Sequence, residues 1–113
     1  MIDYNRRRFR GESAAPDAEA TVAVYRQAGD LLWGESEGGS VRRGSLTGVV
    51  HTDGSAEFAY TMVLAGGEVV AGHCVSTPEF LPDGRIRLTE IWERFGENAD
   101  RGVSYLIELP SGS

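Results

Sequence analysis

The chain has 113 residues, a formal net charge of -6 and one cysteine, with hydrophobic residues at 41% and charged residues at 25%. This length and composition indicate one soluble globular domain with a single core. The acidic balance argues against nucleic acid or an anionic membrane as a partner. A lone cysteine excludes an internal disulfide, and neither a signal peptide nor an apolar run of ~18 residues is apparent, so we expect a cytoplasmic protein.

Glycine-centred turns separate short runs of β-branched and aromatic residues, a pattern typical of all-β proteins. The sequence predicts eight strands, at residues 3–11, 20–28, 31–37, 41–51, 55–65, 68–77, 85–95 and 103–109. Nearly all links have hairpin length, so consecutive strands should be antiparallel neighbours. Because closure removes both exposed edges, we predict an eight-stranded antiparallel up-and-down barrel, a calycin-like meander. An open curved sheet or a two-sheet sandwich is the alternative.

The barrel is expected to form one domain over residues 1–110, followed by a disordered tail at 111–113. The longest link, residues 11–19, is the candidate for a mobile flap or a short helical turn. The remaining links are short and rich in glycine, and they predict how neighbouring strands pair.

Residues 81–85 fit a three-residue hairpin loop, with proline at its first corner and glycine in the left-handed position. This loop predicts the pairs Ser76 with Glu90 and Cys74 with Trp92. Residues 51–55 fit the same turn and predict the pairs Gly48 with Phe58, Leu46 with Tyr60 and Gly44 with Met62. Bare glycines opposite large side chains are typical of a barrel interior that accommodates bulk.

The link at residues 65–67 allows two registers. As a three-residue loop it pairs Tyr60 with Gly72, whereas a two-residue turn pairs Tyr60 with His73 and reverses the face of strand 68–77. We prefer the first because it gives one consistent interior. The predicted inner face then comprises Gly44, Leu46, Gly48, Val50, Phe58, Tyr60, Met62, Val70, Cys74, Ser76, Ile86, Leu88, Glu90, Trp92 and Arg94. Aromatic and aliphatic walls with a few polar groups are typical of a ligand pocket.

Four short motifs run through most of the chain. They are Tyr4-Asn5 through Phe9 and Gly11; Gly44, Leu46, Gly48 and Val50; Gly72, Cys74, Ser76 with Thr77, Pro78 and Glu79; and Gly84 through Trp92. In these motifs the chain resembles a small uncharacterised bacterial family of calycin-like barrels. The resemblance implies a fold and a shared residue set. Some members carry the label N-acetylglutamate synthase, but the sequence predicts no helix whose N-terminus could bind the pyrophosphate of acetyl-CoA, so N-acetyltransferase activity is not expected.

Glu90 is the principal candidate for a functional residue, because a carboxylate on an inner face must be paired, hydrogen-bonded or protonated. It could orient a ligand, act as an acid or base, or be a buried anchor bonded to Ser76. Arg94 lies four residues further along the strand, about 13 Å away, which is too far for an easy ion pair with Glu90. The candidate ligand-binding residues are Tyr60, Phe58, Met62, Cys74, Ser76, Glu90, Trp92 and Arg94.

Other constellations favour structural interpretations. Cys74 has no histidine placed beside it to act as a base, so a buried structural role is favoured over a nucleophile. His51 and His73 are too few to predict a metal site, and the glycine-rich stretches lack the features of a nucleotide-binding loop, so we expect no cofactor. Tyr25 and Trp33 are expected on the outer face, where exposed aromatic residues would favour a partner surface such as that of a homodimer.

Three hypotheses for function follow. The barrel could bind a small apolar or aromatic molecule, it could be a cyclase- or isomerase-type enzyme in which Glu90 transfers protons, or it could be a filled interaction module without a ligand. A solvent-connected cavity of a few hundred cubic ångströms beside Glu90 and Trp92 would favour binding or catalysis, and a filled interior would favour the third hypothesis.

Overall fold

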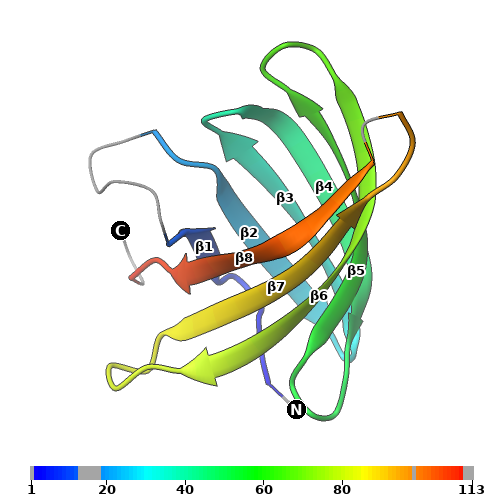
Figure 1. The fold of residues 1–113 in the computed structure, drawn as a ribbon. Coiled ribbons are helices and arrows are strands. Elements are labelled where there is room, and N and C mark those ends of the chain that lie inside the picture. Colours follow the sequence, from blue (N-terminus) through cyan, green and yellow to red (C-terminus); the bar gives the residue numbers. More distant parts are fainter. Residues whose placement is uncertain (1, 13–18, 98, 111–113) are drawn as a thin grey trace.

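The structure, a computed structural model, describes residues 2–12, 19–97 and 99–110 and confirms the closed barrel. Its strands are β1 (Arg8–Gly11), β2 (Val22–Ala28), β3 (Leu31–Gly38), β4 (Val41–Val50), β5 (Ala56–Leu64), β6 (Val69–Phe80), β7 (Ile86–Arg94) and β8 (Asp100–Glu108). Each strand pairs antiparallel with the next, and β1 also pairs with β8, which closes the sheet (Figure 1). Within these ranges no helix is long and apolar enough to cross a membrane.

Three hairpin loops share the predicted geometry and set the register of β4 to β7. In each loop a glycine amide donates a hydrogen bond to the carbonyl three residues before it: Gly54 to His51, Gly67 to Leu64, and Gly84 to Leu81, each at 2.9 Å. These glycines have φ values of 90°, 92° and 87°, a left-handed conformation that favours glycine over residues with a Cβ. The predicted register is therefore correct throughout this part of the sheet.

The observed pairs include every pair predicted from the three loops. Ser76 lies opposite Glu90 and Cys74 opposite Trp92. Tyr60 lies opposite Gly72, so the alternative pairing with His73 is wrong and the preferred face of β6 is confirmed. The pairs between β4 and β5 are Gly48 with Phe58, Leu46 with Tyr60, and Gly44 with Met62.

Three strand boundaries differ from the prediction by three residues or more, and the others agree within two residues. Strand β1 begins at Arg8 rather than at residue 3, and β8 begins at Asp100 rather than at residue 103. Strand β6 continues to Phe80 through Pro78, because β5 begins at Ala56 opposite Ser76 and leaves the last residues of β6 paired with β7 alone. A proline is tolerated on such an unpaired edge. The predicted tail at 111–113 and the central part of the predicted flap, residues 13–18, lie outside the described residues.

The residues that precede β1 cover one end of the barrel. Tyr4 is fully buried there, and its hydroxyl donates a hydrogen bond of 2.7 Å to the carbonyl of Gly54 in the β4–β5 loop. Arg7 donates to the Glu108 carboxylate at 2.8 Å, and this carboxylate also accepts a bond from the Ile86 amide. The N-terminal segment thus reaches the end of the barrel that carries the β4–β5 hairpin (Figure 1). We call this the closed end.

Tyr25 occupies the inner face, which corrects its expected position on the outside. The turn at Gly29 and Asp30 pairs Ala28 with Leu31, and this register places Tyr25 opposite Gly34 rather than on the face of Trp33. The side chain of Tyr25 is buried, while that of Trp33 is 40% exposed. Tyr25 therefore belongs to the core.

The core is continuous along the inner face from the closed end toward the middle of the barrel. Aromatic rings follow one another at centroid distances of 5.0 to 6.5 Å, in the order Tyr4, Phe9, Tyr25, Phe58 and Tyr60. Aliphatic side chains of Leu32, Val50, Ile86 and Leu88 complete this region. Its burial accounts for the stability of the closed end, because apolar area removed from water is the main favourable contribution to folding.

Candidate functional site

A cavity of about 800 Å³ occupies the other end of the barrel. Residues of the rim line it, among them Glu12, Thr21 and Ser40, so it opens at the end opposite the Tyr4 segment. The described side chains therefore do not fill the interior, and this observation disfavours the hypothesis of a filled interaction module. A volume of this size lies within the roughly 300–1,000 Å³ that is typical of small-molecule sites.

Most of the predicted ligand-binding residues line this cavity. They are Phe58, Tyr60, Met62, Cys74, Glu90, Trp92 and Arg94. Ser76 is the exception, since it is fully buried behind the cavity and makes its contact through Glu90. Sequence reasoning missed the lining residues Phe9, Tyr25, Ser36, Ser104 and Leu106, which come from strands whose faces no three-residue loop determined.

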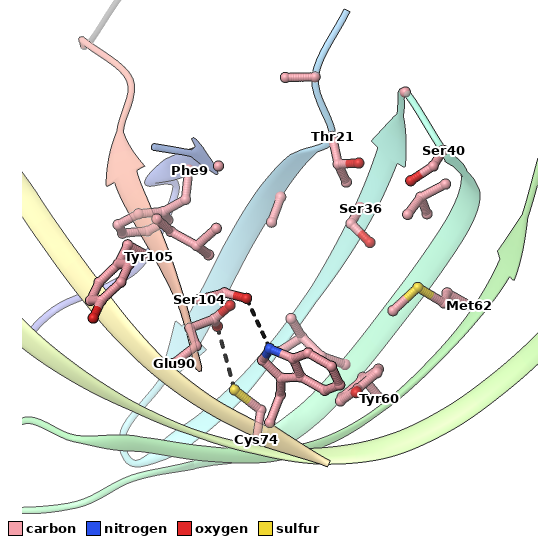
Figure 2. Close-up of a pocket in the computed structure, with 18 of the residues that line it drawn as sticks. Phe9, Thr21, Ser36, Ser40, Tyr60, Met62, Cys74, Glu90, Ser104 and Tyr105 are labelled. Atoms are coloured by element: carbon pink, nitrogen blue, oxygen red, sulfur yellow. Dashed lines mark hydrogen bonds between the residues drawn. The ribbon is translucent and has the colours of Figure 1, made fainter. Parts of the chain in front are cut away.

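Glu90 lies at the base of the cavity and is held by β6. The Ser76 hydroxyl donates a hydrogen bond of 2.9 Å to Glu90 Oε2, and the Cys74 thiol lies 3.5 Å from the same oxygen. Figure 2 shows the side chains of Glu90 and Cys74 next to one another, joined by a dashed line. The predicted bond between Ser76 and Glu90 is confirmed. It occupies one carboxyl oxygen and leaves Oε1 without a hydrogen-bond partner among the described residues.

Burial in the barrel raises the pKa of the Glu90 carboxyl above its ordinary value of 4.5, and the bonds from Ser76 and Cys74 oppose part of that rise. The protonated form is thereby favoured relative to a carboxyl in water, and a protonated carboxyl can donate a hydrogen bond. Burial, with a further contribution from Glu90, also raises the pKa of the Cys74 thiol. A thiol with a raised pKa is a poor nucleophile, so a structural role for Cys74 is supported.

Tyr25 lies beside this carboxyl at the boundary between core and cavity. Its hydroxyl makes no hydrogen bond within the described part of the chain, although the residue is almost completely buried and lines the cavity. Burial, together with the charge of Glu90, raises the pKa of Tyr25 well above 10.0, so the hydroxyl stays protonated. The oxygen is not among the enclosed polar atoms that lack a partner, so it is accessible from the cavity. A molecule in the cavity could supply its hydrogen-bond partner.

Trp92 forms one wall nearer the opening. Its indole nitrogen donates a hydrogen bond of 2.8 Å to the hydroxyl of Ser104 on β8 (Figure 2). It also lies opposite Gly102, where a Cβ would be only 2.7 Å from the indole ring. The absence of a side chain at Gly102 therefore lets the ring pack closely against the backbone of β8.

The outer surface carries the two histidines. His51 and His73 each lie 2.9 Å from a different oxygen of Glu57, and all three residues are substantially exposed. Among the residues described, no group of three or more histidine, cysteine or acidic side chains is arranged to hold a metal ion. Trp33 is exposed as predicted, and the homodimer stays a prediction.

Comparison with known proteins identifies the fold family. The model of the avidin-like protein family matches residues 2–109, and the chain therefore belongs to that family. Neither the curated proteins nor the solved structures give a match. The avidin-like assignment agrees with the closed eight-stranded meander and with the predicted calycin-like barrel. At the level of the family, it indicates small-molecule binding in general.

Proposed function

We propose that this protein binds a small apolar or aromatic molecule inside the barrel. One observation carries the proposal: the cavity of about 800 Å³ is open at one end and contains polar groups that have no hydrogen-bond partner among the described residues. Membership of the avidin-like family supports the same conclusion. A cavity of this kind contributes nothing to folding, because its lining forgoes the packing contacts that a filled core would make.

The base of the cavity determines how the ligand is oriented. The Tyr25 hydroxyl can donate a hydrogen bond, and burial favours the form of Glu90 that can also donate one, so a ligand group that accepts, such as a carbonyl or an ether oxygen, fits between them. Phe58, Tyr60 and Trp92 supply flat apolar surface above that point. The preferred ligand therefore has an acceptor at its inner end and a planar or aliphatic body.

Fluorescence titration with the neutral probe N-phenyl-1-naphthylamine tests the proposal. The wild-type protein should bind the probe with enhanced emission. Ser36→Phe places a ring in the cavity from β3 and should weaken binding at least about tenfold, a loss of roughly 1.4 kcal/mol. Glu35→Phe places the same ring on the outer face of the same strand and should bind like the wild type. Equal binding by both variants would contradict the proposal.

Native mass spectrometry of the purified protein gives an independent measurement, in which a retained small molecule appears as added mass. The alternative in which Glu90 transfers protons stays a prediction, and Glu90→Gln distinguishes it from binding alone. Loss of turnover of a candidate substrate with retained affinity would indicate catalysis. A loss of affinity without any turnover in the wild type would indicate an orienting role.

A further inference from the structure

Arg94 ends the inner face of β7 at the opening of the cavity, and among the described residues its guanidinium has no anionic partner. Its central carbon lies 5.4 Å from the centroid of the Trp92 ring. Its Nε atom is buried and has no hydrogen-bond partner, and within the described residues no carboxylate forms a salt bridge with it. A half-buried cation with an unsatisfied N–H group is costly unless a partner is supplied.

The carboxylates nearest the opening do not fill this role. Glu12 lines the cavity, but it forms a salt bridge with Arg87 on the outer face. Glu19 also lines the cavity, is exposed and makes no ion pair among the residues described. Glu90 lies four residues before Arg94 on the same strand, about 13 Å away at the ordinary rise of a strand. Glu90 and Arg94 thus mark opposite ends of the cavity.

Gly72 determines how closely the aromatic neighbour Tyr60 approaches Arg94. Gly72 lies between Tyr60 and Arg94 in the register of β5, β6 and β7. A Cβ at Gly72 would be 2.5 Å from the Tyr60 hydroxyl oxygen, so only glycine lets that side chain cross β6 toward β7. The Tyr60 hydroxyl then donates to the Glu93 carbonyl at 3.2 Å, next to Arg94. The arginine is therefore flanked by two aromatic residues, Tyr60 and Trp92, that limit its movement.

We propose that Arg94 binds a carboxylate or sulfonate group at the outer end of the ligand. This inference rests on the proposed function, since it concerns the same cavity. A guanidinium recognises such groups through paired N–H donors, and flanking aromatic rings strengthen the site by excluding water. The ligand class is then an amphipathic organic anion: an acceptor group at Glu90 and Tyr25, an apolar body along the aromatic wall, and an anionic end at Arg94.

The net charge of the protein sharpens this assignment. At -6 the molecule as a whole repels anions, so affinity for an anionic ligand requires a local cationic group. Arg94 is the arginine that lines the cavity in the described part of the chain. Replacing Arg94 by a neutral residue should therefore lower the affinity for anionic ligands selectively. The same replacement of an arginine on the outer face should leave that affinity unchanged.

Two fluorescent probes of similar shape test the inference. 1-Anilinonaphthalene-8-sulfonate carries a sulfonate, and N-phenyl-1-naphthylamine has the same aromatic frame without it. In Arg94→Gln the affinity for the sulfonate should fall about tenfold or more, because a hydrogen bond to a charged group is lost. The affinity for the neutral probe should stay within about twofold of the wild type. Arg101→Gln, on the exposed surface of β8, is the matched control and should change neither affinity.

The outcomes separate this inference from the proposed function. If both probes bind the wild type and Arg94→Gln weakens them equally or not at all, the anionic assignment is overturned while small-molecule binding stands. If neither probe binds any variant, the proposed function itself fails. Ser36→Phe must abolish the sulfonate signal, and persistence of that signal would place the probe outside the barrel and overturn the assignment. Near-ultraviolet circular dichroism of each variant confirms that the fold is retained.

Discussion

Strand β7 passes from the closed end of the barrel to the open end, and its inner face changes character on the way. Ile86 and Leu88 are fully buried beneath the Tyr4 segment, whereas Trp92 and Arg94 are half-buried and line the cavity. Glu90 marks the transition. The two halves of this strand therefore have different roles. The first half fills the core. The second half presents polar and aromatic groups to an open space that contributes nothing to folding.

The largest expected difference between the closed end and the open end is in the free energy of unfolding that is lost when a side chain is truncated. Leu88→Ala leaves a cavity in a packed region and should lower the free energy of unfolding by about 3–4 kcal/mol. Met62→Ala removes a half-buried side chain that already borders open space, and should cost about 1 kcal/mol or less. Urea denaturation of both variants gives the two values. Similar values would mean that the open end is packed as tightly as the closed end.

A smaller difference in stability is expected when the hydroxyl of a tyrosine is removed at each end. Tyr4 donates a buried hydrogen bond of 2.7 Å to Gly54, and Tyr60 donates a bond of 3.2 Å near the opening. Tyr4→Phe should cost about 1–2 kcal/mol because it leaves a buried carbonyl unsatisfied, while Tyr60→Phe should cost less than about 0.5 kcal/mol. The comparison is made by thermal unfolding. A larger loss for Tyr60→Phe would show that the Tyr4 segment does not hold the closed end.

The raised pKa of Glu90, the residue at the transition, predicts that the stability of the protein depends on pH. The pKa of Glu90 is raised in the folded protein, so the unfolded state loses this proton first as the pH rises above about 4.5. Wild-type stability should therefore decline through that range until the folded-state pKa is passed. Glu90→Gln removes this decline and should be more stable than the wild type at pH 7, with the difference vanishing below pH 4.5. A variant that is less stable at pH 7 would indicate that the ionised carboxylate is satisfied inside the barrel.

Much of the open end could be predicted from the sequence because short loops determine it. Gly54, Gly67 and Gly84 fix the register of four strands, and that register alone places Ser76 opposite Glu90. The link at Gly29 contained the same kind of information for Tyr25, since a two-residue turn places that residue opposite Gly34. The inner position of Tyr25 is therefore predictable from this turn, and the expectation of an outer position is wrong.

Other features depend on contacts that the local sequence does not encode. Tyr4 reaches Gly54 across 50 positions of the chain, and no periodicity indicates such a contact. The size of the cavity depends on side-chain conformations, among them that of Trp92, whose ring packs against Gly102 and bonds to Ser104. That the Nε atom of Arg94 has no hydrogen-bond partner among the described residues is likewise a result of packing, although the distance of Arg94 from Glu90 followed from the strand pattern.

The two tryptophans provide the most direct test of the central claim that the barrel interior binds a small molecule. Trp92 lines the cavity, whereas Trp33 is exposed on the outer face. In a ¹H–¹⁵N correlation spectrum each indole N–H gives one signal. Addition of N-phenyl-1-naphthylamine to the ¹⁵N-labelled protein should shift the Trp92 indole signal in a saturable manner and leave that of Trp33 unchanged. A shift of Trp33 with no change at Trp92 would contradict the account.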